Sequence, residues 1–267
     1  MKSFALKFCL IYSTLLKIVL VVNGLVADDC KSLPSYSALK DALINATYPH
    51  NSNGGLEFDM WGAIVTKSGI VCQVVYTGSD FSSQYLVSRV VSMQKANTAN
   101  SLSLDRFALS TANLYSAVQP GGTLYGLQES NPINFAVYDG NSKHFGTTKD
   151  PAIGKRCGGI NIFGGGLALY MGNEKIGGLG VSGDTSCADH NIAWRVRKML
   201  KLDGNLAKGG TGGLVGGESD AMILDRDAVA IDASGVAKAS LSGWGHPICS
   251  QDSRRIGKAI GAVVDSI

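Results

Sequence analysis

The side chains of this chain that can most readily exchange protons or bind metal near neutral pH are four histidines, and two have restrictive neighbours. His246 lies between Gly245 and Pro247 and precedes Cys249 in the segment GWGHPIC. These neighbours limit the freedom of the backbone, which suits a ligand or a catalytic base. The sequence is equally compatible with a histidine that packs in a rigid turn and hydrogen-bonds to backbone groups.

His190 is the second candidate, and it follows Asp189 at the beginning of a helix predicted over residues 188–201. A carboxylate at this place is most often a cap. Because Asp189 shares the helix side predicted to face the core, it could instead orient a histidine through a hydrogen bond. His190, His246 and Asp189 could therefore perform acid–base or metal-assisted chemistry on a small molecule. His144, in a long polar loop, could also reach a ligand, although a surface position is favoured.

Two cysteines lie beside these candidates. Cys187 precedes the His190 helix and Cys249 follows His246, so we expect a Cys187–Cys249 disulfide that brings both histidines to one end of the sheet. It would close a loop of about 60 residues and stabilise the fold by about 2–4 kcal/mol. Pairing of Cys187 with Cys157 is the alternative. Five cysteines follow residue 27, an odd number, and none has zinc-finger spacing, which argues against a structural zinc site.

The first 27 residues have the features of a secretory signal: early lysines, a long apolar stretch and small residues at two cleavage positions. They carry three lysines and no acid, so the formal charge falls from +3 to 0 on their removal. A neutral mature chain argues against nucleic acid or an anionic membrane as the main partner. We expect a secreted protein, periplasmic if bacterial, with a glycosylation sequon at Asn45 that matters only in a eukaryote.

The spacing of apolar residues predicts an α/β (α+β) chain in which helices alternate with hairpins. We divide it into the signal peptide, one domain over 28–203, and a C-terminal elaboration over 204–267 that packs back on that domain. The predicted elements are helices over 34–46, 82–103, 104–115 and 188–201, hairpins over 61–75, 165–183 and 228–241, a loop over 131–157 that covers a ligand or a neighbouring subunit, a glycine-rich connector over 204–217, and a last helix carrying Ile256, Ile260, Val263 and Ile267. On helix 188–201, Ile192, Val196 and Met199 are predicted to face the core.

The predicted strands over 165–183 contain many glycines, which weaken a strand unless something must approach its backbone closely. The approaching group could be another chain or a flat ligand. Residues 178–183 also fit the dinucleotide fingerprint G-x-G-x-x-G. That fingerprint should end a strand and open a helix, whereas here it lies within the return strand of a hairpin. We therefore expect the glycines to serve close packing.

The glycine-rich segment resembles the signature of the GlcG/HbpS-type haem-binding, haem-degrading family, which is a G-x-x-GVSG strand followed by a helix with an aspartate. Here these are residues 177–183 and Asp189. Further resemblance lies in the Lys-Ala-x-Thr-Ala core at 95–99 and in segments 63–75, 118–132, 158–169 and 243–249, so that most of 34–250 is covered in order. The resemblance implies a profilin-like antiparallel sheet with packed helices, and assembly into homo-oligomers.

The resemblance also implies a non-covalently bound haem, and some relatives are described as breaking it down and releasing its iron. We expect a secreted protein that binds haem, or another small molecule, with two glycine-rich surfaces, near 164–166 and 177–183, joining subunits. Met93 could offer iron a sulfur atom, although its apolar stripe favours packing. An enzyme that uses His190, His246 and Asp189 on a different small molecule is the alternative. The expected haem contacts are His190 and His246 as iron ligands, with His144, Gly165, Gly166 and Met93.

Overall fold

The computed structural model describes residues 30–48, 52–204, 209–225 and 240–266. The predicted signal peptide, residues 205–208 of the connector and most of the predicted hairpin over 228–241 lie outside these ranges. The chain divides into two compact units, Met1–Ser32 and Leu33–Ile267, and the larger one carries all the elements below. No helix of the described ranges has both the length and the apolarity to cross a membrane.

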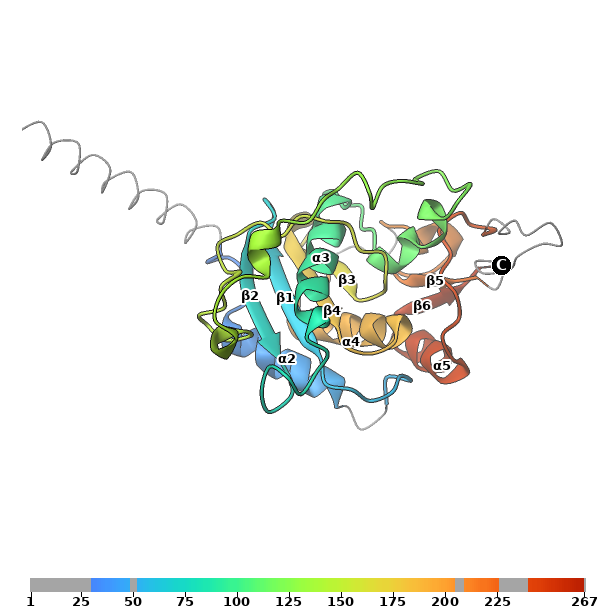
Figure 1. Cartoon of the computed structure of the whole chain (residues 1–267). Coiled ribbons are helices and arrows are strands. Elements are labelled where there is room, and N and C mark those ends of the chain that lie inside the picture. The colour runs from blue at the N-terminus through green and yellow to red at the C-terminus, as the bar shows by residue number, and fades with distance from the viewer. Residues whose placement is uncertain (1–29, 49–51, 205–208, 226–239, 267) are drawn as a thin grey trace, which may run out of the picture. The chain divides into compact units, whose positions relative to one another are not determined.

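A four-stranded antiparallel sheet in the order β2-β1-β4-β3 forms the centre of the larger unit (Figure 1). The two predicted hairpins supply its strands, which are β1 (Trp61–Thr66), β2 (Val71–Tyr76), β3 (Gly166–Met171) and β4 (Glu174–Ser182). The hairpins join through β1 and β4, whose register places Gly62 opposite Val181 and Ala63 opposite Gly180. The predicted mixed α/β class with an antiparallel sheet is confirmed.

Helices cover both faces of the sheet. On one face lies α3 (Val87–Ser101), against which Trp61, Ala63 and Val65 of β1 pack together with Met93. On the other lie α2 (Tyr36–Thr47) and α4 (Ser186–Met199), and Leu43 of α2 packs over Gly62. Ser35 and Thr185 cap the last two helices by accepting hydrogen bonds from Ala38 and Ala188 N–H groups.

The glycines of the sheet explain how closely α3 approaches. A Cβ on Gly180 would lie 1.8 Å from the Ser92 carbonyl oxygen, and one on Gly178 would lie 2.2 Å from that of Ala96. The group that approaches these strands is therefore a helix of the same chain, and not a flat ligand or a second copy. This corrects the expectation that residues 177–183 join subunits, because α3 already occupies that surface.

The long loop over 131–157 is held against the same helix. Arg89 of α3, 2 % exposed, donates to both Asp150 carboxylate oxygens and to the Val137 carbonyl. Val137, Ala152 and Cys157 complete the apolar cluster around Met93. The loop thus packs on the core through these residues, and its expected role in covering a ligand or a neighbouring subunit stays a prediction. Its regular parts are the short 3-10 helices η3 (Phe135–Val137) and η4 (Ser142–His144).

The C-terminal residues form a second small sheet, in which β5 (Met222–Leu224) pairs in parallel with β6 (Val263–Asp265). Arg197 of α4 binds it to the main sheet by donating to both Asp220 oxygens and to the Ala168 carbonyl. Before β6 lies α5 (Gln251–Ile260). The remaining described elements are the 3-10 helices η1 (Thr111–Leu114), η2 (Ser116–Val118) and η5 (Gly212–Val215).

Three local predictions are wrong. The helix over 104–115 is replaced by a turn, closed by a bridge between Leu104 and Phe107, and by η1. The last helix ends at Ile260 because Gly261 takes a left-handed conformation with φ +79°, and Val263 then lies in β6. Met199 is 49 % exposed, since it lies in the last turn of α4 beyond the packed stripe.

Candidate functional site

The disulfide between Cys187 and Cys249 is present and joins the first turn of α4 to the C-terminal tail, with the two Cα atoms 6.0 Å apart. Cys30 and Cys72 are also disulfide-bonded. Among the described cysteines Cys157 is the free thiol, buried under α3, and burial raises its pKa to about 12. The alternative pairing of Cys187 with Cys157 is therefore not adopted.

His246 lies beside this disulfide and is 3 % exposed. Its Nε2 is 2.7 Å from Ser186 Oγ and its Nδ1 is 2.7 Å from the Pro247 carbonyl oxygen. Because a carbonyl only accepts, Nδ1 carries the proton and Nε2 accepts from the Ser186 hydroxyl, which itself accepts from the Gly164 N–H. Burial lowers the pKa of His246 to about 4, so the ring is neutral near pH 7.

His190 is enclosed on the same helix and fully buried. Its Nε2 lies 3.0 Å from the Ala262 carbonyl oxygen, and its Nδ1 finds no hydrogen-bond partner among the described residues. Burial lowers its pKa to about 4. The ring packs against Trp194, with 6.0 Å between the ring centroids. His190 therefore reaches neither solvent nor a cavity large enough for a porphyrin in the described structure.

Asp189 forms a buried ion pair with Lys95, whose Nζ is 2.7 Å from Oδ2, while Oδ1 accepts from the Asp184 N–H. Lys95 also donates to the Val181 carbonyl, and so connects α3, β4 and α4. Burial raises the pKa of Asp189 to about 6, against the opposing effect of Lys95. Asp189 thus orients a lysine and the turn before α4, and it makes no hydrogen bond to either histidine.

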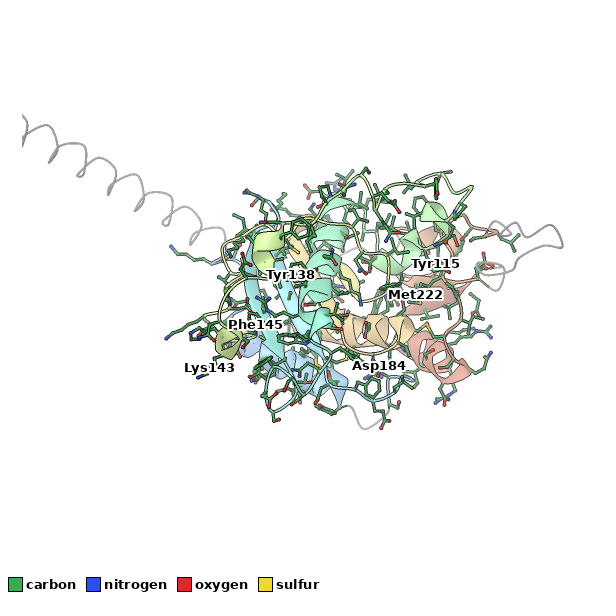
Figure 2. All side chains as sticks on the ribbon, in the orientation of Figure 1. Tyr115, Tyr138, Lys143, Phe145, Asp184 and Met222 are labelled. Atoms are coloured by element: carbon green, nitrogen blue, oxygen red, sulfur yellow. A yellow bond between two sulfur atoms is a disulfide. The ribbon has the colours of Figure 1, made fainter. Side chains whose placement is uncertain are left out.

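The other expected haem contacts separate into buried and exposed groups. Met93 is fully buried in the apolar cluster under α3. A Cβ on Gly165 would lie 2.3 Å from the Val181 carbonyl oxygen, and one on Gly166 would lie 2.3 Å from Thr111 Cγ2. The structure leaves no room for a haem ring at these three residues. His144 is exposed in η4. Figure 2 labels its sequence neighbours, Lys143 and Phe145.

Two cavities that the sequence did not reveal lie on either side of Phe58. The aromatic cavity has a volume of about 470 Å³ and is lined by Phe58, Phe81, Ser82, Ser83, Gln84, Tyr85 and Leu86. Phe58 and Tyr85 meet edge to face with 5.5 Å between the ring centroids, and both are exposed. Its volume lies within the range of about 300–1,000 Å³ typical of small-molecule sites. Leu56 and Val87, close in sequence to its lining residues, are also exposed apolar side chains.

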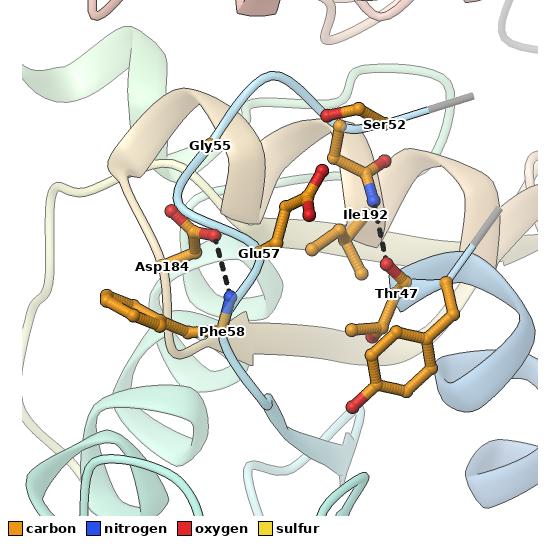
Figure 3. A pocket seen from close by; sticks show the side chains of 9 residues that line it. Thr47, Ser52, Gly55, Glu57, Phe58, Asp184 and Ile192 are labelled. Atoms are coloured by element: carbon orange, nitrogen blue, oxygen red, sulfur yellow. Dashed lines mark hydrogen bonds between the residues drawn. The ribbon is translucent and has the colours of Figure 1, made fainter. Parts of the chain in front are cut away.

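The acidic cavity, of about 410 Å³, is lined by Thr47, Tyr48, Ser52, Asn53, Gly55, Glu57, Phe58, Asp184 and Ile192. Figure 3 shows Glu57 between Asp184 and Ile192. Asp184 accepts hydrogen bonds from the backbone N–H groups of Leu56 and Phe58, and so fixes the segment that presents the Phe58 ring. Acid side chains here disfavour an anionic ligand, so the aromatic cavity is the better place for an apolar ring with carboxylate substituents.

A ring contact connects the lining of the aromatic cavity to the segment that carries His144. Phe81, which lines the cavity, contacts the Phe145 ring edge to face with 6.1 Å between centroids. Phe145 follows His144 directly, and the Arg89 guanidinium lies over the Phe145 ring, 3.9 Å from its centroid. Among the three histidines expected to contact haem, His144 is therefore the exposed one, and it is next to Phe145, which contacts a ring that lines this cavity.

The structure defines a small mixed α/β fold, with an antiparallel sheet between helices. The model of the family described as haem degrading protein HbpS-like matches residues 60–197, just over half of the chain. This chain belongs to the HbpS-like family. The match covers the sheet, α3 and most of α4, and ends before the C-terminal sheet.

Solved structures with a similar arrangement share little sequence with this chain. The crystal structure titled PduOC:heme complex is 23 % identical, with a TM-score of 0.43, over 62 % of this chain and 91 % of that one. Klebsiella pneumoniae protein ORFY is 24 % identical, with a TM-score of 0.42, over 63 % and 90 %. HbpS is 14 % identical, with a TM-score of 0.40, over 62 % and 89 %. No curated protein sequence matches the chain.

Proposed function

We propose that this chain is an exported protein that binds haem non-covalently, with the porphyrin seated in the aromatic cavity. Family membership supports haem as the ligand. The observation that carries the location is a cavity of about 470 Å³ lined by three aromatic rings and a leucine, all close to the surface. Apolar ring edges would enter this cavity, and the carboxylate substituents would remain in water beside the Ser82 and Ser83 hydroxyls.

We propose Tyr85, which lines this cavity, and His144, which precedes Phe145, as the groups that hold the iron. His144 offers an exposed imidazole, and Tyr85 offers a phenol oxygen on a side chain that is 57 % exposed. Imidazole and phenolate are both known haem ligands. His190 and His246 do not fit this role, because both rings are buried and hydrogen-bonded to the fold. When bound, haem would supply a redox-active iron, while Phe58 and Phe81 would shield the ring from water.

Breakdown of the bound haem with release of its iron is the further activity that we propose on the same site. The family's description supports it. It is separable from binding in one experiment, since loss of the porphyrin absorption under air with a mild reductant reports breakdown, and an iron chelator in solution reports release. A chain that only binds would keep its absorption band.

Equilibrium titration with haem tests the proposal, with absorption and tryptophan quenching as readouts. Phe58→Ala removes an aromatic wall worth about 2 kcal/mol of apolar burial, so we expect haem to bind roughly 30-fold more weakly. Phe135→Ala is the matched control, because Phe135 is 77 % exposed and lies outside both cavities. Equal affinities for the two variants and the wild type would refute the location.

A second candidate is an enzyme that uses His246 for acid–base chemistry, and the 2.7 Å contact between Ser186 Oγ and the unprotonated Nε2 favours it. Asp189 and His190 contribute no hydrogen bond to this pair. A fluorophosphonate probe that labels the wild type, but not Ser186→Ala, would support this candidate. If the probe did not label the wild type while haem bound to it, the enzyme candidate would be refuted and the haem-binding proposal would stand.

A further inference from the structure

Three potential ligand atoms meet at the first turn of α4. The sulfur atoms of Cys187 and Cys249 and a ring nitrogen of His246 all lie within 4.8 Å of one another. We propose that reduction of the Cys187–Cys249 disulfide converts this place into a binding site for a divalent cation of the zinc type, with two thiolates and His246 Nε2 as ligands. The proposal does not depend on haem, since the aromatic cavity is lined by none of these residues.

The donor set is the one that zinc prefers. Thiolate and imidazole are its usual protein ligands, and two cysteines with one histidine leave a fourth position open for an oxygen. Ser186 Oγ, 2.7 Å from Nε2, is placed to supply that oxygen directly or to hold a water there. Two thiolates neutralise a divalent cation, so the buried complex would carry no net charge.

His246 is already prepared for such a role. Its Nδ1–H donates to the Pro247 carbonyl, which fixes the tautomer with a lone pair on Nε2. A metal-bound histidine usually donates its other ring N–H to a carbonyl or carboxylate in this way. For the lone pair on Nε2, a metal ion would have to displace only the hydrogen bond from the Ser186 hydroxyl.

The surroundings also favour thiolate. Cys187 is at the N-terminal turn of a 14-residue helix, where unpaired N–H groups stabilise negative charge. The Cys187 N–H itself lies 3.2 Å from Cys249 Sγ and donates to it. Cys187 is 1 % exposed, whereas Cys249 is exposed, so one sulfur of the pair is open to an attacking thiol.

The chemistry balances with a dithiol as the named co-reactant. Its thiolate attacks Cys249 Sγ, the Cys187–Cys249 bond breaks, and the second thiol of the reductant resolves the mixed disulfide. The protein disulfide gains two electrons and two protons, and the dithiol becomes a disulfide. Zinc then displaces two protons as both thiolates bind. The oxidised protein, with its sulfur atoms bonded to each other, holds no such site.

Cobalt(II) tests this inference, because it replaces zinc and reports thiolate ligation by a charge-transfer band and tetrahedral geometry by intense visible bands. We expect both signals after reduction of the purified protein with a phosphine, none before reduction, and their loss when zinc is added. Cys249→Ser should abolish the charge-transfer band of a two-thiolate site. His246→Asn should weaken binding at least tenfold.

Two variants serve as controls, because reduction also opens the other disulfide. Cys157→Ser removes the buried free thiol and Cys72→Ser removes a disulfide-bonded cysteine elsewhere, and both should keep the cobalt spectrum. Far-UV circular dichroism follows the fold, and if the reduced chain loses structure, zinc should restore it. The inference would be overturned if the reduced wild type with cobalt showed no thiolate band. It would also be overturned if Cys249→Ser gave the same cobalt spectrum as the wild type, or if zinc failed to restore a fold lost on reduction.

Discussion

Substitution of Gly180 by alanine tests how the sheet and α3 fit together. The new Cβ would lie 1.8 Å from the Ser92 carbonyl oxygen and 2.6 Å from the Ala96 backbone nitrogen, and both atoms belong to the helix backbone. Ordinary van der Waals contact begins at 3.4 Å. A helix backbone cannot give way as a side chain can, so α3 would have to move from the sheet along its length and loosen the cluster around Met93.

The expected cost is at the upper end of the range for overpacked cores, about 3 kcal/mol or more. It outweighs the gain of up to about 1 kcal/mol from removing a glycine from a strand. Gly62→Ala is the matched control, since it lies on the neighbouring strand and faces α2. There the nearest atom is Leu43 Cδ2 at 3.0 Å, the end of a side chain that can rotate. We expect its effect to stay within about 1 kcal/mol.

Urea denaturation followed by circular dichroism, with the disulfides intact, gives the free energy of unfolding of both variants. A loss of about 3 kcal/mol corresponds to a fall in the melting temperature of roughly 6–12 °C for a chain of this size. If Gly180→Ala were no less stable than Gly62→Ala, the close packing of α3 on β4 would be refuted.

Three further predictions concern buried charge and export. Lys95→Met should destabilise the fold by about 3–5 kcal/mol, because it leaves the Asp189 carboxylate buried without its partner, and Lys95→Met/Asp189→Leu should recover most of this in denaturant melts. His190 and His246, with pKa values lowered to about 4, should together make the fold less stable as pH falls from 6.5 to 4, by about 3 kcal/mol each. The raised pKa of Asp189, about 6, has the opposite sign and offsets roughly one histidine, so urea melts that show no net loss of stability over this range would contradict the assignment. The exported protein should begin between Leu25 and Asp28, and N-terminal sequencing that finds Met1 would refute cleavage.

Periodicity in the sequence predicted the main elements of the sheet correctly. The pattern of small and apolar residues in 61–75 and 165–183 is strong, and the tight turns at Lys67–Gly69 and Gly172–Asn173 have few alternatives. The sequence predicts secondary structure less well where contacts distant in the chain determine it. Val263 continues the apolar spacing of the last helix, yet it lies in β6, which is stabilised by pairing with β5, a strand about 40 residues earlier in the chain.

The candidate site was predicted only in part. The sequence indicated that Cys187 and Cys249 could meet, and they do, which places His246 at the N-terminus of α4. It did not indicate Ser186 as the partner of His246, because a serine next to a helix cap has an ordinary explanation.

Lys95 and Asp189 both lie in segments that resemble the family, yet neither spacing nor type pairs two residues this far apart in sequence. The aromatic cavity was also missed, since Phe58 lies in an aperiodic segment, Tyr85 lies in a predicted helix that begins only at Val87, and folding alone brings the two together. The sequence offered no signal for the cavity, because single exposed apolar residues are common and only a contiguous patch marks a binding surface.

Homo-oligomer formation stays a prediction, but the surface expected to join the subunits is no longer the glycine-rich strand β4. Because α3 covers the glycines of β4, a second copy would have to use other residues. The exposed apolar side chains around Phe58 could serve a ligand or a subunit, and light scattering with and without haem separates these roles.

Hydrogen–deuterium exchange with and without haem tests the location of the ligand most directly. A porphyrin in the aromatic cavity should protect the backbone amides of residues 81–86 and 142–145, whereas residues 186–190 and 246–249 should exchange equally in both states. Protection confined to the segments around His190 and His246 would contradict the proposed site.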